Sequence, residues 1–249
     1  MNYYELLDVV GYLGKLMLEN GAETYRVEDS IERLALAYGI SRIDVYAAST
    51  SIMITITTPD DKSLTRIKRI KSRSTNLDKI ERLNRLCRSA CTTKPDVALI
   101  KRTLIAIRLR PDYSLKVQMF GYGLTTWSFC LFFGGSHLDA LCALAIGPAT
   151  RLTSHFLSRL ETNVFFTTIL SSSVISLMGL LFFNLQWTQR LDLVIIGAIM
   201  PLVPGVALTN SIRDLMAGDF VAGQARLMEA VLTATCIALG VGIPLSLFT

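Results

Sequence analysis

The sequence contains no lysine after Lys116, although 25 of its 249 residues are lysine or arginine. Residues 117–249 carry only five arginines and six acidic residues, and the other basic and acidic side chains all lie in residues 1–116. Hydrophobic residues make up 51% of the chain, and the mean hydropathy is +0.44. A charge-rich half followed by a charge-poor, apolar half is typical of a soluble domain joined to a membrane domain.

Motifs of the common enzyme classes are also missing. The sequence has two histidines and contains no glycine-rich phosphate loop, no HExxH and no GxSxG. Cys87 and Cys91 are four residues apart, but no His or Cys pair accompanies them, which favours reduced thiols over a metal site. We therefore expect no enzyme activity, no metal and no cofactor.

Residues 1–115 predict a cytoplasmic α+β domain. Glu5 and Asp8 interrupt any apolar run at the N-terminus, so no secretory signal is expected there. Apolar residues at helical spacing predict helices, and alternating residues predict three antiparallel strands. The expected helices cover 3–19 and begin near Thr24, Leu77 and Pro95, and the expected strands cover 42–48, 52–56 and 62–70.

A basic run from Arg66 to Arg73 ends this group of strands. Nucleic-acid binding is one interpretation of such a run. Attraction of the domain to anionic lipids, or a solvated strand edge, explains the same charges more simply. We expect lipid contact and no nucleic-acid partner.

Uncharged stretches in residues 116–249 predict a transmembrane domain of about five helices, because about 20 apolar residues cross a bilayer. Arg108, Arg110 and Lys116 precede the first stretch and place the N-terminal domain in the cytoplasm, in a multi-pass protein of the cell membrane. The spans are expected near 117–137, 138–158, 162–184, 192–212 and 229–248.

The fourth of these spans contains Pro201, Pro204 and Gly205 near its middle. Each proline removes a backbone donor and clashes with the preceding turn, so a break is expected. Unpaired backbone groups are tolerated in a membrane only where they face protein or water, and broken helices form the substrate sites of many secondary transporters. A simple kink that aids packing is the alternative.

A dense polar stretch follows this span. Its arginines, Arg213 and Arg226, could neutralise a carboxylate substrate, and its acids could carry a proton if burial raises their pKa values. A cytoplasmic loop with mutually paired charges is an equally good interpretation. The acidic candidates for proton carriers are Asp214, Asp219 and Glu229.

Two segments resemble a known family. The segment from Pro204 to Arg226, with its Asn210-Ser-Ile-Arg213-Asp214 core, resembles the signature of the threonine/serine exporter family in its N-terminal module. The segment Gly21–Glu28 resembles the early motif of that module. The resemblance covers nearly the whole chain and implies export of threonine and serine in fused members. Split members pair two short proteins, and one related pair is similar to a succinate exporter.

The resemblance also bears on partners. The chain ends at Thr249, directly after the fifth expected span, so the second membrane module of the fused form is expected on a separate, smaller multi-span subunit. Assembly into a homo-oligomer stays open. Within the early motif, Gly21, Glu23, Arg26 and Glu28 are candidates for a gate or partner contact, although a helix stop and the helix dipole also explain the glycine and the acids.

These observations lead to one hypothesis. The chain is expected to be a subunit of a secondary exporter of small carboxylate-bearing metabolites, either threonine and serine or a dicarboxylate such as succinate. A membrane-anchored sensor or assembly factor without transport activity is the alternative. The residues expected along the substrate path are Pro201, Pro204, Gly205, Asn210, Arg213, Asp214 and Arg226.

Overall fold

The structure, a computed structural model, describes residues 3–160 and 162–248. The chain divides into two compact units: Met1–Pro111 with Val206–Met228, and Asp112–Gly205 with Glu229–Thr249. The sequence placed a single boundary after residue 115. The structure differs in that Val206–Met228 belongs to the first unit, because its polar side chains pair with that unit's helices, as described below.

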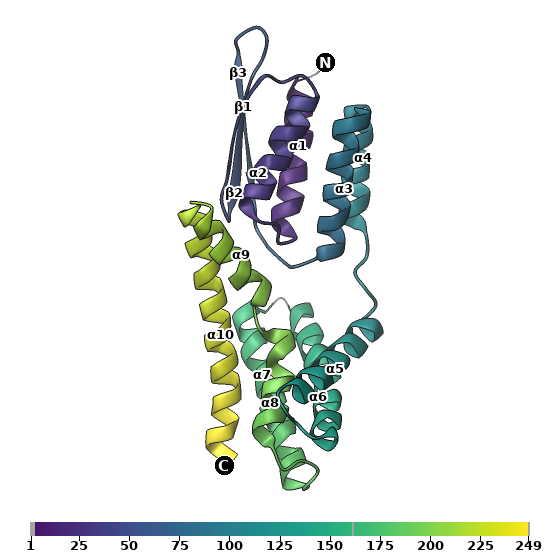
Figure 1. The fold of residues 1–249 in the computed structure, drawn as a ribbon, viewed down its shortest axis with the longest axis vertical. Coiled ribbons are helices and arrows are strands. Elements are labelled where there is room, and N and C mark those ends of the chain that lie inside the picture. Colours follow the sequence, from purple (N-terminus) through teal and green to yellow (C-terminus); the bar gives the residue numbers. More distant parts are fainter. Residues whose placement is uncertain (1–2, 161, 249) are drawn as a thin grey trace. The chain divides into compact units, whose positions relative to one another are not determined.

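The first unit is an α+β domain of three layers. Figure 1 shows the sheet on one side of α1 and α2, and α3 and α4 on the other side of these two helices. The predicted helices and the antiparallel three-stranded meander are confirmed. The elements are α1 (Tyr3–Glu19), α2 (Thr24–Ala37), β1 (Arg42–Ala47), β2 (Ser51–Thr57), β3 (Ser63–Arg69), α3 (Leu77–Thr93) and α4 (Val97–Leu109).

The alternation of β2 explains the core of this unit. Ile52, Ile54 and Ile56 point to one face of the sheet and are fully buried, together with apolar residues of α1, α2, α3 and α4. One expected helix start is corrected, because Asp96 is the N-cap of α4 and Pro95 lies before it.

The second unit is a helical bundle. Its core lies among its helices, which approach closely where small residues meet. A Cβ at Gly147 of α6 would lie 2.7 Å from the Tyr122 carbonyl of α5. The helices are α5 (Leu115–Phe132), α6 (His137–Arg159), α7 (Val164–Asn184), α8 (Leu191–Ile199) and the C-terminal part of α10 (Phe220–Phe248).

Two helices in the described residues, α7 and α10, are long and apolar enough to cross a membrane. A third span is possible if α8 and its continuation in α9 (Gly205–Met216) count as one broken span. The expected spans near 117–137 and 138–158 correspond to α5 and α6, and their crossing of a bilayer stays a prediction.

The expected break in the fourth span is confirmed. Helix α8 ends at Ile199, a 3₁₀ turn covers Met200–Leu202, and α9 begins at Gly205. Val203 is extended, with ψ of 128°. This conformation follows from Pro204, because a proline ring disfavours the helical conformation of the preceding residue.

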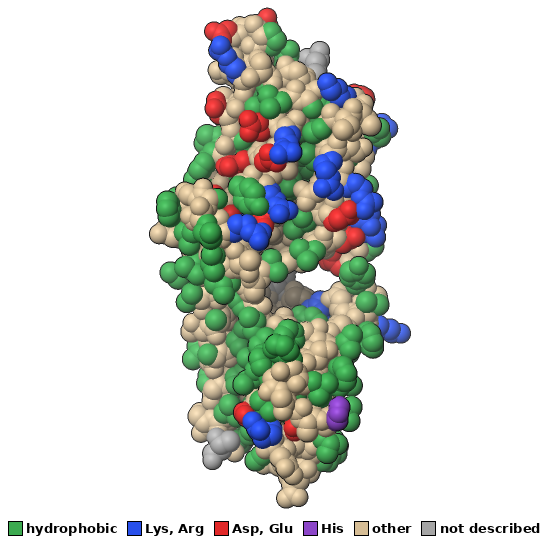
Figure 2. Space-filling view, viewed as in Figure 1, with side chains coloured by type: hydrophobic (Ala, Val, Ile, Leu, Met, Phe, Trp, Pro, Cys, Tyr) green, Lys and Arg blue, Asp and Glu red, His purple; other side chains and the backbone are tan. Residues whose placement is uncertain are grey.

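The two units differ in surface charge. Figure 2 shows blue and red side chains gathered over the elements of the first unit, while hydrophobic side chains dominate the visible face of the second unit. This distribution agrees with the composition of the two halves of the sequence.

Candidate functional site

The turn between α1 and α2 presents two backbone carbonyls to α9 and α10. Gly21 has a φ of +93°, a left-handed conformation that favours glycine. The Gly21 carbonyl accepts a hydrogen bond from Asn210 Nδ2 at 3.0 Å. The Ala22 carbonyl accepts one from Arg226 Nη2 at 2.7 Å. The two segments that resemble family motifs therefore contact each other.

Helix α2 has no side-chain cap from its own N-cap residue, Glu23. Its first residue, Thr24, instead donates to Asp214 Oδ1 of α9, at 3.4 Å from the backbone nitrogen and at 2.8 Å from Oγ1. The first N–H groups of a helix need acceptors, and negative charge is favourable there. A residue 190 positions away in the sequence therefore supplies the carboxylate for the start of α2.

Asp214 also forms a buried ion pair with Arg226. The Arg226 Nε and Asp214 Oδ2 atoms are 3.3 Å apart, and the two side chains are 6% and 0% exposed. Removing one member of such a pair leaves an uncompensated charge and typically costs 3–5 kcal/mol. This pair joins α9 to α10 within the first unit.

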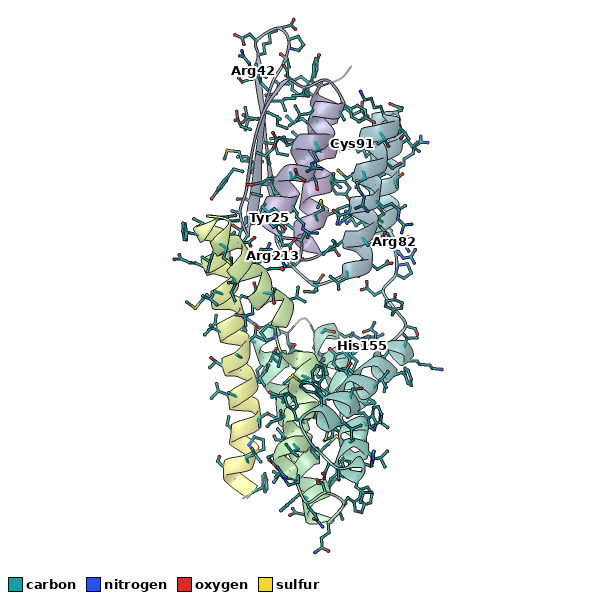
Figure 3. All side chains as sticks on the ribbon, in the orientation of Figure 1. Tyr25, Arg42, Arg82, Cys91, His155 and Arg213 are labelled. Carbon is teal, nitrogen blue, oxygen red and sulfur yellow. The ribbon has the colours of Figure 1, made fainter. Side chains whose placement is uncertain are left out.

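A second, more exposed charge cluster surrounds Glu23. Its Oε2 lies 2.5 Å from Arg26 Nε, and its Oε1 accepts a hydrogen bond from Arg213 of α9. Figure 3 shows Tyr25 on α2 and Arg213 on α9 at the end of the first unit that carries the α1–α2 turn. The Tyr25 hydroxyl accepts a hydrogen bond from Arg26 Nε at 3.1 Å.

In the segment Val206–Met228, which we call the α9–α10 hairpin, the two helices are joined by a short turn and pack closely against each other. Gly218 has a φ of +90° at the turn between the two helices. A Cβ at Gly223 would lie 2.6 Å from Leu215 Cγ, so a larger residue would separate the helices. Asp219 Oδ1 accepts from the Ala222 nitrogen at the start of α10 at 3.2 Å.

A further contact joins the hairpin to the sheet. Ser49 Oγ, in the β1–β2 turn, donates to the Ala222 carbonyl at 3.2 Å. The nitrogen of Ala47, which precedes Ser49 by two residues, donates to Glu28 Oε1 at 2.7 Å. Burial raises the pKa of the Glu28 carboxyl, the Ala47 hydrogen bond opposes this, and the negative charges of Asp219 and Asp214 raise the pKa further.

A pocket of about 160 Å³ lies in the first unit beside Glu23. The end of α1, the α1–α2 turn, the start of α2, α3 and α9 form its wall. The pocket is lined by Met17, Gly21, Ala22, Glu23, Arg26, Leu77, Ile80, Asn84, Val206 and Asn210. Charged, amide and apolar groups thus meet in one cavity.

The structure divides the expected substrate-path residues between the units. Asn210, Arg213, Asp214 and Arg226 gather around the α1–α2 turn, together with the gate candidates Gly21, Glu23 and Arg26. The remaining substrate-path residues, Pro201, Pro204 and Gly205, belong to the second unit, as does the proton-carrier candidate Glu229.

Sequence reasoning missed three contributors to this site. They are the Thr24 hydroxyl, the Ala22 carbonyl and the Ser49 hydroxyl. One signal was available for Thr24, because a helix start without a local capping side chain needs an acceptor from elsewhere. Nothing in the sequence pattern indicated Ala22 or Ser49.

Comparisons with known proteins cover almost the whole chain. The family model described as "Putative threonine/serine exporter" matches residues 8–248. A "Threonine/serine exporter" of Corynebacterium glutamicum is 22% identical over 251 residues, which cover 97% of this chain and 51% of that protein. The "Probable succinate transporter subunit YjjP" of Escherichia coli (strain K12) is 23% identical over 239 residues, which cover 94% of this chain and 91% of that protein.

The lengths differ between these relatives. A "Probable threonine/serine exporter" of Mycobacterium tuberculosis is 24% identical over 244 residues, which cover 97% of this chain but 46% of that protein. The chain thus spans about half the length of the threonine/serine exporters that it matches. No solved structure matches the chain.

Proposed function

Because the chain belongs to the threonine/serine exporter family and carries helices able to cross a membrane, we propose that it is a subunit of a secondary exporter of small carboxylate-bearing metabolites. Candidate substrates are threonine and serine, or a dicarboxylate such as succinate. The observation that carries this proposal is the contact between the α9–α10 hairpin and the α1–α2 turn. Through this contact, helix α9, which begins directly after the proline break, is bound to the charged first unit.

The membrane part of the solute path is proposed at the proline break. Pro201 and Pro204 leave backbone groups without helical partners, and Gly205 begins the next helix. Helix ends of this kind present partial charges that a polar solute can use. The first unit is proposed to be cytoplasmic and the second to lie in the cell membrane.

The contacts of the hairpin support a gate at the inner end of the path. Asn210, Arg213, Asp214 and Arg226 are engaged by the α1–α2 turn and by each other, so we assign them the role of a latch. Releasing the latch would free two guanidinium groups for a substrate carboxylate. Arginine suits this role because its planar fork binds carboxylates in a bidentate manner.

A proton could drive the cycle through the acids of this region. Asp214 lies within the latch, and Asp219 caps α10 at the hairpin turn. Protonation of Asp214 would remove the charge that holds Arg226, and the latch would weaken. Glu229 follows the hairpin directly in the sequence and is the third carrier proposed.

A second small multi-span membrane subunit is proposed as the partner. The E. coli relative, 91% of which is covered, is named as a transporter subunit, and the matched exporters are about twice as long as this chain. That partner would contribute what corresponds to the rest of the longer exporters.

The test is metabolite efflux from cells that lack their own exporters. Cells loaded with labelled threonine, serine or succinate would express the chain alone, or with a short multi-span protein encoded beside it. We expect efflux of at least one substrate only in the paired arm. Efflux from the chain alone would contradict the partner, and no efflux in any arm would contradict transport and favour the sensor alternative.

Arg213→Ala tests the latch in the same assay. Loss of the guanidinium group that is proposed to bind the substrate carboxylate is expected to lower efflux by about tenfold or more, with the protein still inserted in the membrane. Arg33→Ala is the control, because Arg33 forms an exposed pair with Asp29 on the same unit. Unchanged efflux by the Arg213 variant would remove the latch from the mechanism.

A further inference from the structure

A second pocket of the first unit, of about 370 Å³, lies between α3 and the C-terminal end of α4. The two helices pack side by side, as Figure 1 shows. Charged and apolar groups share the wall of this α3–α4 pocket, which is formed by Arg82, Thr103, Ala106, Ile107, Leu109, Arg110 and Pro111. It is distinct from the pocket beside Glu23, because the two have no lining residue in common.

The two arginines of the α3–α4 pocket share one carboxylate. Asp78 Oδ2 lies 3.0 Å from Arg82 Nε and 3.1 Å from Arg110 Nε. These three groups carry a net charge of +1, and the shared carboxylate holds the two guanidinium groups close together. Arg110 contacts Asp78 through Nε and its side chain is 47% exposed, so its terminal nitrogens can still bind an anion. A phosphodiester, with one negative charge, neutralises such a site, and arginine forks bind phosphate oxygens well.

The apolar part of the wall is open to the outside. Leu109 is 74% exposed, and Ala106 and Pro111 are exposed as well. Ile105, one helical turn before Leu109, is 40% exposed. Large apolar side chains exposed beside arginines are typical of a helix that lies at a membrane interface. A soluble anion would contact only the arginines, whereas a phospholipid would also cover the apolar rim.

The covalent chain keeps this pocket near the start of α5. Pro111 precedes Leu115, the first residue of α5, by four positions. Four residues of extended chain span at most about 14 Å. Helix α5 is predicted to enter the bilayer, and a headgroup layer about 5–8 Å deep lies on each side of the hydrocarbon. The pocket is therefore within reach of phospholipid headgroups.

We infer that the α3–α4 pocket binds an anionic phospholipid, with its phosphodiester on Arg82 and Arg110 and the glycerol end of its acyl chains on Leu109 and Pro111. A zwitterionic phospholipid would bring its own cation close to the same arginines, so anionic headgroups are preferred. The inference goes beyond the proposed function, because it concerns neither the substrate nor the partner and requires only that the second unit lies in a membrane. The bound lipid holds the end of α4 at the membrane surface, directly before the chain enters α5.

Calorimetric titration of the purified full chain in a neutral detergent tests the inference. The probe is dioctanoyl phosphatidylglycerol, and the comparisons are dioctanoyl phosphatidylcholine, glycerol phosphate and inorganic phosphate. We expect each comparison ligand, which lacks either the net charge or the acyl chains, to bind at least about tenfold more weakly than phosphatidylglycerol. Equal affinity for phosphatidylcholine would show that the arginines do not select a charge. Equal affinity for glycerol phosphate or inorganic phosphate would replace the lipid by a soluble phosphate, and either outcome overturns the inference.

A charge-removing variant distinguishes this pocket from general attraction of lipids to a basic domain. Arg110→Gln removes one guanidinium group, while Arg82 still neutralises Asp78. It should weaken phosphatidylglycerol binding by about tenfold or more. Lys71→Gln is the matched control, because it removes the same charge from an exposed position in the basic run that ends the strands. Equal weakening in both variants would mean that the lipid responds to the total charge of the domain, and the pocket would be refuted.

A pocket-filling variant tests the apolar rim without removing a charge. Ala106→Phe adds volume at an exposed position of the lining. It should abolish phosphatidylglycerol binding while the lipid-free protein unfolds at nearly the same temperature. Ile105→Phe is the control, because this isoleucine is 40% exposed and lies outside the pocket lining. Unchanged or tighter binding by Ala106→Phe would refute the assignment.

These titrations separate the inference from the proposed function, because they require no transport and no second subunit. Phosphatidylglycerol binding that depends on Arg110, without efflux of any metabolite from cells, would support the pocket and contradict the exporter role. Efflux from cells by a chain that shows no preference for phosphatidylglycerol would overturn the pocket and leave the exporter role standing.

Discussion

The two units bring their buried polar groups into different kinds of contact. In the first unit, charged side chains distant in sequence meet, as in the Asp214–Arg226 pair and its contacts with the α1–α2 turn. In the second unit, hydroxyl groups make the comparable contacts, because they bond to carbonyls, to each other and, at Thr188, to the buried Asp139 carboxylate. Thr126 Oγ1 donates to the Ala143 carbonyl at 2.7 Å, and the hydroxyls of Ser154 and Ser171 are 2.8 Å apart.

This difference indicates which region is built to move. Separating close-packed helices exposes surfaces that fit only each other. Separating an ion pair instead exposes groups that water, a proton or a charged solute can satisfy. The α9–α10 hairpin is therefore the better candidate for a moving element, and the bundle of the second unit is the better candidate for a rigid frame.

The largest expected effect comes from breaking the buried pair. Arg226→Ala leaves the Asp214 carboxylate buried and should lower the free energy of opening of the hairpin by about 3–5 kcal/mol. Hydrogen exchange of the amides in α9 measures this directly. Arg33→Ala, in an exposed pair with Asp29, should cost less than about 1 kcal/mol. Equal exchange rates in the two variants would mean that the buried pair holds nothing in place.

The proposal that the second unit is a rigid frame is tested by adding volume at a close contact between two of its helices. Gly147→Ala places a Cβ 2.7 Å from Thr126 Oγ1 and the Tyr122 carbonyl, so overpacking should cost about 1–3 kcal/mol. Both tryptophans, Trp127 and Trp187, lie in the second unit, and their fluorescence during thermal unfolding reports this loss.

The matched control is Gly121→Ala, on α5 like the two contacting residues. A Cβ at Gly121 meets nothing within 4 Å among the described residues. Its unfolding temperature should be equal to or slightly above that of the unsubstituted chain, because alanine is the better helix former. If both variants unfold alike, the bundle tolerates added volume and is less rigid than proposed.

Local patterns predicted most of the fold, because they depend on residues close in sequence. The alternation of Ile52, Ile54 and Ile56 predicted the central strand, and Pro204 predicted the helix break. The latch was not predictable in this way. Thr24 and Asp214 are 190 residues apart, and neither the α2 start nor the polar stretch identifies its partner. The division at residue 115 failed to place the hairpin for the same reason.

A smaller effect is expected at the other end of α1. Asp8 Oδ1 lies 2.6 Å from Lys68 Nζ and 2.9 Å from Arg66 Nη2 of β3. The hydrogen bond from Lys68 is the main cause that lowers the pKa of Asp8 to about 2. Asp8→Asn should destabilise the first unit by about 1 kcal/mol at neutral pH.

The pH dependence of the Asp8 variant checks this cause. A carboxyl with a lowered folded-state pKa stabilises the fold above its ordinary pKa, and the contribution disappears as the pH falls through about 2. The difference between the variant and the unsubstituted chain should therefore shrink on acidification, in hydrogen exchange of α1 amides. A difference that stays constant down to pH 2 would show that packing, and not charge, is responsible.

The smallest expected effect concerns Glu28 and has the opposite sign. Burial raises the pKa of this carboxyl, so the folded state holds its proton more tightly than the unfolded chain does. The contribution of Glu28 to stability is then complete below its ordinary pKa and is lost as the pH rises through the raised value. Glu28→Gln keeps an acceptor for the Ala47 nitrogen and removes the titration.

The variant should therefore match the unsubstituted chain in acid and become more stable than it as the pH rises towards neutrality. The stability difference is measured by unfolding the first unit in denaturant, with hydrogen exchange of the β1 amides as the readout. Because Asp214 and Asp219 of the hairpin contribute to the raised pKa, Asp219→Asn should reduce the gain. If Asp219→Asn leaves the stability gain of Glu28→Gln unchanged, the charge of the hairpin does not affect the pKa of Glu28. The moving element would then be confined to the latch residues.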